Sequence, residues 1–96
     1  MGWRPNSAPV SDFGTNDARY YRERGISAYR RGDFSLALAD FDLAISLDPG
    51  LSDAHVDRGI VFHRMGDLKR AFADVAEAKR IDDFNRSAAS PGTSAP

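Results

Sequence analysis

Apolar residues recur at spacings of three and four along most of the chain, which is the pattern of helices that bury one face. This periodicity predicts four helices, at about 18–31, 34–47, 52–65 and 68–81. The second segment is apolar around more than half of its circumference, so it is expected to be covered on two sides. The pattern therefore predicts an all-α fold.

Two Gly-Asp pairs join these helices into hairpins, because Gly32 and Gly66 are each followed by an aspartate. Glycine ends a helix cheaply in the left-handed conformation, and the aspartate accepts from the free amides that begin the next helix. The candidate caps at the other helix starts are Asn16, Asp17 and Ser52. The chain is thus predicted to form two helical hairpins.

The two hairpins are copies of one unit, since ten residues recur 34 positions later in the same register. The residues that recur are Arg24, Gly25, Ile26, Arg30, Gly32, Asp33, Ala37, Ala39, Asp40 and Ala44. A fixed period in this range is typical of stacked repeats, in which each unit covers the apolar face of its neighbour.

With Ala18 and Ser52 as first positions, the chain resembles the tetratricopeptide repeat family over residues 18–85. The matching residues are Gly25, Gly59, Ala37, Ala71, Ala44, Ala78, Phe41, Pro49 and both Gly-Asp turns. The second unit departs from the family where Val75 and Asp83 replace an aromatic residue and a proline, and His55 replaces the aromatic residue that is Tyr21 in the first unit. The resemblance implies a short right-handed α-solenoid of two tandem repeats, residues 18–51 and 52–85.

The two ends lack any helical period. Residues 1–17 are interpreted as a flexible arm and residues 86–96 as a disordered tail, since both are rich in small, polar and proline residues. Trp3 and Phe13 either dock on an uncovered helix face or belong to a plain tail.

Composition excludes several function classes. The net charge of −1 offers no field to attract nucleic acid or anionic lipid, and no apolar run is long enough to span a membrane. The chain has no cysteine, and His55 and His63 are eight residues apart on one helix, too far to share a metal ion or a proton. We therefore expect no catalytic, metal or cofactor site, and a soluble, cytoplasmic protein.

Two duplicated features are interpreted as scaffold. Arg24 and Arg58 are each followed 16 residues later by an aspartate, Asp40 or Asp74, which predicts an ion pair between helices. Gly25 and Gly59 are costly inside helices unless another helix approaches closely, and the expected contacts are Ala37 and Ala71.

The resemblance also implies a protein-binding groove lined by the first helix of each unit. Its residues would be Arg19, Arg22, Glu23, Ile26, Tyr29, Arg30, Asp53, Val56, Asp57, Ile60, His63 and Arg64. This surface is basic with an apolar centre in the first unit, which suits a peptide carrying acidic and apolar groups. Alternatively, the arginines pair with Asp53 and Asp57 and form an ordinary solvated face.

The last helix carries Phe72, Val75 and Ile81 on a face that no further unit covers, which makes them a candidate self-association face. The resemblance implies a non-catalytic module for protein-protein interaction, an adapter or scaffold whose groove receives a peptide or protein segment. The alternative function is structural assembly, with homo-oligomerisation through the final helix.

Overall fold

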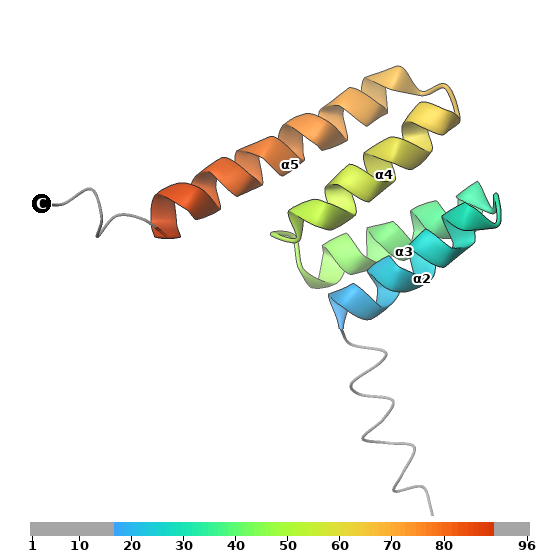
Figure 1. Cartoon of the computed structure of the whole chain (residues 1–96), viewed down its shortest axis with the longest axis horizontal. Helices are drawn as coiled ribbons and strands as arrows, with labels where there is room; N and C mark the ends of the chain where they lie inside the picture. Colours follow the sequence, from blue (N-terminus) through green and yellow to red (C-terminus); the bar gives the residue numbers. More distant parts are fainter. Residues whose placement is uncertain (1–16, 90–96) are drawn as a thin grey trace, which may run out of the picture.

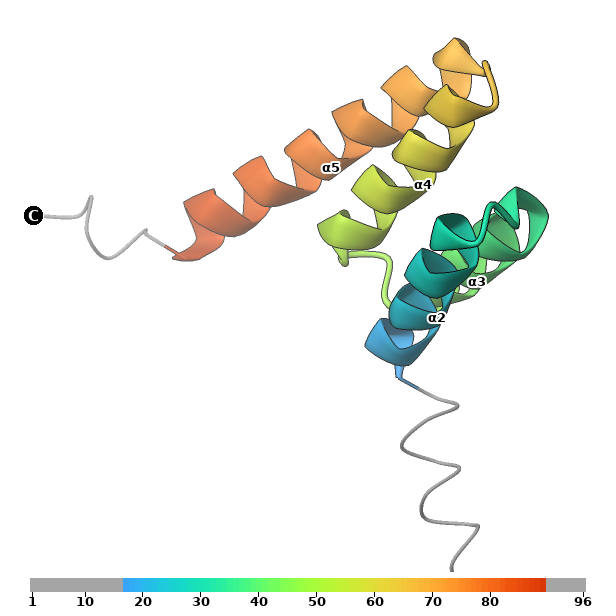
Figure 2. The same cartoon turned by 45° about the vertical axis from the view of Figure 1, so that its right-hand side comes forward.

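The computed structural model describes residues 17–89, which form four helices and no strand. The helices are α2 (Ala18–Arg30), α3 (Phe34–Leu47), α4 (Ser52–Arg64) and α5 (Leu68–Ala89). They form two hairpins, α2–α3 and α4–α5, and α4 lies between α3 and α5 in both views (Figures 1 and 2). The predicted all-α fold of tandem hairpins is confirmed. The arm with Trp3 and Phe13 lies outside the described residues.

Both tight turns have the predicted chemistry. Gly32 and Gly66 have φ angles of 82° and 88°, in the left-handed region that glycine adopts without a steric penalty. Asp33 Oδ1 accepts from the Leu36 amide at 3.2 Å, and Asp67 makes the equivalent bond at the start of α5. The repeated Gly-Asp pairs therefore set the hairpin geometry twice.

The two hairpin starts differ in how they are capped. Asp17 caps α2 and accepts from the Arg19 amide at 2.9 Å, as predicted for this position. The predicted cap at Ser52 is wrong, because Leu51 is the N-cap residue and offers no side-chain acceptor. Ser52 lies inside the helix, and its hydroxyl donates to Asp82 Oδ1 at 2.6 Å. This bond ties the start of α4 to α5.

Side chains of α4 complete the core of the first hairpin. Val61 is fully buried in one apolar cluster with Ala28, Ala37 and Phe41. Ala54 joins a second cluster with residues of α2 and α3. Small residues at these contacts allow the helix axes to approach closely. The first hairpin is therefore covered by α4, as expected for stacked units.

Helix α5 is longer than the sequence pattern indicated. The predicted end near Ile81 is wrong, because the helix continues to Ala89. The disorder predicted from residue 86 onward is therefore also wrong for residues 86–89. The second unit has Asp83 where the first has Pro49, so no residue forces the helix to stop. Asp83 instead bonds Lys79 at 3.0 Å and Arg86 at 2.9 Å along the helix. Figure 1 shows α5 running past the start of α4.

These helical ion pairs make the end of α5 sensitive to acid. The pKa of Glu77 is lowered by a hydrogen bond from Arg80, and that of Asp83 by bonds from Lys79 and Arg86. A lowered pKa in the folded state means that the stabilisation is present at neutral pH and is lost as these carboxylates are protonated.

We expect the last turns of α5 to fray when the pH is lowered from about 7 to about 3. Amide hydrogen exchange measured by NMR should then rise at residues 82–89 before it rises in α3. Asp83→Asn should exchange faster at neutral pH already and respond less to acid. Equal protection of α5 at both pH values would contradict the prediction.

Candidate functional site

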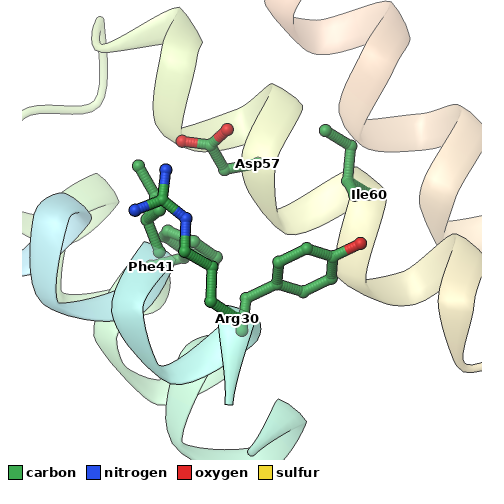
Figure 3. Close-up of a pocket in the computed structure, with 6 residues that line it drawn as sticks. Arg30, Phe41, Asp57 and Ile60 are labelled. Carbon is green, nitrogen blue, oxygen red and sulfur yellow. The ribbon is translucent and has the colours of Figure 1, made fainter. Parts of the chain in front are cut away.

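A hollow of about 290 Å³ opens between α2 and α4. It is lined by Ile26, Tyr29, Arg30, Phe41, Asp57 and Ile60 (Figure 3). Five of these residues belong to the groove that the resemblance implied. The sixth, Phe41 of α3, was not among the predicted groove residues, and it lines the hollow because its ring passes over Gly25, which has no side chain.

Tyr29, in the apolar wall of the hollow, makes contacts on both sides of the groove. The Tyr29 ring stacks on Phe34 with centroids 5.6 Å apart, and its hydroxyl accepts from Arg64 at 3.1 Å. The Arg64 guanidinium also lies about 6 Å from both rings, within reach of cation–π attraction. Arg64 therefore orients Tyr29 from across the groove.

An ion pair closes one side of the groove. Arg22 Nε donates to Asp57 Oδ2 at 2.5 Å, and both side chains are largely buried. Burial raises the pKa of Asp57, although the Arg22 hydrogen bond opposes this shift. Burial also acts against the charge of Arg22, but the bond to Asp57 and nearby carboxylates leave its pKa raised. The alternative prediction, that groove arginines pair with carboxylates of the next helix, is therefore correct for Arg22.

Arg30 differs from Arg22 in its surroundings. It is exposed, and it forms no ion pair with any residue of the described part of the chain. Figure 3 shows its guanidinium extending over Phe41 toward Asp57 at the edge of the hollow. The groove therefore presents an available cation, Arg30, beside an apolar recess.

The remaining groove candidates lie outside this hollow. Arg19 is exposed and lies 3.5 Å from Asp17 on its own helix turn. His63 lies beside a second hollow, which also includes Ile60. The other three candidates are on the exposed surface: Glu23, Asp53 and Val56.

Both predicted inter-helix ion pairs are present. Arg24 Nη2 bonds Asp40 Oδ1 at 2.8 Å, and its Nε lies 3.1 Å from Oδ2. Arg58 bonds Asp74 within its own hairpin and also Asp42 of α3, each at 2.7 Å. The first pair links two helices of one hairpin, and Arg58 additionally joins the two hairpins.

The predicted self-association face is only partly exposed. Phe72 and Val75 are 68% and 52% exposed, whereas Ile81 is 8% exposed, so its assignment to this face is wrong. Ile81 shares the buried side of α5 with Ala71, Asp74 and Ala78, at helical spacings of three and four. Phe72 and Val75 are more exposed and lie on a different side of α5 from these buried residues.

Neither histidine lies in a metal-binding group, since residues 17–89 contain no cluster of three or more potential ligands. His55 is buried, with Nε2 at 3.4 Å from the Pro49 carbonyl oxygen. None of the helices within 17–89 has the length and apolar character needed to cross a bilayer.

Residues 18–51 match the tetratricopeptide repeat family, and this range covers the first hairpin and its following loop. No curated protein matches the sequence. Tetratricopeptide repeats are generally protein-protein interaction modules that bind proteins or peptides, and the family is typically non-catalytic.

Proposed function

Since this chain carries a tetratricopeptide repeat at 18–51, followed by a second hairpin with the same turns, we propose that it is a non-catalytic adapter with repeats at 18–51 and 52–85. Its groove between α2 and α4 receives a segment of another protein. The observation that carries this proposal is the apolar hollow beside Arg30.

The lining of the hollow indicates the chemistry of the bound segment. Ile26, Tyr29, Phe41 and Ile60 provide an apolar recess of about 290 Å³, which is enough for one large aliphatic or aromatic side chain. Arg30 at the rim is available for a carboxylate, and a charge-assisted hydrogen bond would orient the segment. Asp57 is neutralised by Arg22 and so repels such a carboxylate only weakly. The preferred segment therefore carries an apolar residue close to an acidic one.

Charge reversal at Arg30 tests this groove. Random 12-residue peptides selected for binding to the wild-type chain should be enriched in adjacent apolar and acidic residues. Arg30→Glu should weaken the selected peptides about tenfold or more, because a cation facing a carboxylate becomes a repelling charge. Fluorescence anisotropy with labelled peptides measures this loss.

Arg31→Glu is the matched control, since it changes the charge equally one residue further on, outside the hollow. Arg22→Glu is unsuitable, because it would place a carboxylate against Asp57 and confuse stability with binding. Peptides that bind Arg30→Glu and Arg31→Glu equally well would refute the groove as the binding site.

A further inference from the structure

The end of the stack formed by α4 and α5 is an apolar surface that no other part of residues 17–89 covers, and it contains a hollow of about 200 Å³. The hollow is lined by Gly59, Ile60, His63, Ala71, Phe72 and Val75. We call this surface the end face. Ile60 also lines the groove hollow, so the two surfaces adjoin but point toward different sides of α4.

The first hairpin shows how such a face is covered. The residues 34 positions earlier are Gly25, Ile26, Tyr29, Ala37, Leu38 and Phe41. Five of these pack in or against the apolar cluster that Val61 of α4 completes, and the sixth, Gly25, lies beneath the Phe41 ring. The occupant of this face in the first unit is therefore an amphipathic helix that inserts one aliphatic side chain.

The end face is deeper than its counterpart at one position. In the first unit the Phe41 ring fills the space over Gly25, since a Cβ there would lie 2.7 Å from Phe41 Cε1. In the second unit Val75 replaces the ring. A Cβ on Gly59 would meet the Ala71 carbonyl oxygen and Asp74 Cβ at 3.2 Å but Val75 Cγ2 only at 3.6 Å, and Gly59 and Val75 both line the hollow. The second unit thus has a hollow beside Val75, where the first unit has the Phe41 ring.

The end face also lacks the charged anchors of its counterpart. Helix α4 is held on the first unit by Asp57, which binds Arg22, and by Arg58, which binds Asp42. The residues equivalent to Arg22 and Asp42 in the second unit are Val56 and Ala76. A helix docked in the same way would bury its own charges at these points without partners, which is costly.

We propose that the end face binds an amphipathic helix of a partner protein, docked as α4 docks on the first hairpin. This helix carries apolar residues at the places of Asp57 and Arg58, and a side chain larger than valine at the place of Val61. The first two residues lie against Val56 and Ala76, and the third fills the hollow over Gly59.

A second copy of this chain stacked head to tail does not meet these requirements. Its α2 would present Glu23, Arg24 and Ser27 at the three places. Arg24 would keep its pair with Asp40. However, Glu23 would face Val56 without a partner, and Ser27 would leave the hollow unfilled. The end face therefore suits a helix of another protein better than it suits α2 of a second copy.

Two peptides of residues 51–65 test the proposal, both stapled on the solvent-facing side because short helices are marginal in water. The probe carries Asp57→Leu, Arg58→Ala and Val61→Leu, and the control keeps the natural sequence. Isothermal titration to the full chain should show the probe binding at least tenfold more tightly than the control. Equal affinities, or no binding of the probe, would overturn the proposal.

The variant Val75→Phe locates the binding site. It recreates the Phe41 and Gly25 arrangement in the second unit, so it should fold with an unchanged or raised melting temperature while probe affinity falls at least tenfold. Phe72→Ser, at an exposed position, should also weaken the probe without loss of helical circular dichroism. Full probe affinity in both variants would place the binding elsewhere.

Light scattering tests whether a second copy of the chain occupies the end face. A dimer that forms with rising concentration and is abolished by Val75→Phe would assign the face to self-association and overturn the proposal. Arg30→Glu should leave probe binding unchanged, so failure of the groove proposal and failure of this one are separable.

Discussion

Gly25→Leu is expected to unfold the protein. Even the first atom of a side chain at Gly25 would lie 2.7 Å from Phe41 Cε1 and 2.9 Å from Cδ1, well inside normal contact distance. The ring cannot move aside easily, because Phe41 is 1% exposed and packs against Ala28, Ala37 and Val61. Far-ultraviolet circular dichroism should show loss of most helical signal and no cooperative melting transition.

Alanine variants give a graded version of this test. Gly25→Ala should be destabilised by about 2 kcal/mol relative to Gly59→Ala, which corresponds to roughly 10 °C in melting temperature for a domain of this size. At Gly59 the nearest atoms are the Ala71 carbonyl oxygen and Asp74 Cβ, both at 3.2 Å, so only small shifts are needed. Alanine also favours the helix by about 1 kcal/mol at both positions, so this gain cancels in the comparison. Equal melting temperatures for the two variants would contradict the proposed role of the Phe41 ring.

Removing Arg24 is expected to lower the folding stability clearly, because its partner Asp40 stays buried without a counterion. Asp40 is 1% exposed, and Arg24 supplies all of its hydrogen bonds from side chains within residues 17–89. The Arg24 side chain itself is 47% exposed and lies 5.3 Å from the Tyr21 ring centre. Arg24→Ala therefore leaves a buried carboxylate without its counterion.

Urea unfolding of Arg24→Ala measures this loss, and Arg19→Ala is the matched control on the same helix. Arg19 is highly exposed, and its contact with Asp17 is worth less than about 1 kcal/mol. The double variant Arg24→Leu with Asp40→Leu should recover much of the lost stability, because replacing both partners leaves no buried charge. If Arg24→Ala were as stable as Arg19→Ala, the unpaired Asp40 carboxylate would not destabilise the fold, and the prediction would be wrong.

The groove illustrates how far a sequence pattern reaches. The family resemblance placed Ile26, Tyr29, Arg30, Asp57 and Ile60 on a common groove surface, and all five line the hollow. The sequence left open whether Arg22 forms an ion pair with Asp57, since these residues are 35 positions apart and their contact depends on how α2 packs against α4. The consequence for function is direct, because Arg30 and not Arg22 remains available to a ligand.

The final helix shows the opposite limit. Its start followed from the Gly66-Asp67 turn, but its end did not, because no strong stop signal follows Ile81. Local ion pairs around Asp83 continue the helix to Ala89, and the packing of α5 on α4 buries Ile81. The exposed face was therefore predicted too broadly.

The sequence by itself determined the local features: four helices, two left-handed glycine turns, and the 16-residue Arg-Asp spacing that pairs helices within each hairpin. These depend on backbone conformation and on contacts between neighbouring helices, which short patterns encode directly. Only the tertiary structure decided that the Phe41 ring covers Gly25 whereas a hollow remains beside Val75 and Gly59. The reason is that a cavity arises from the volumes of side chains on different helices, and no single periodic pattern contains that sum.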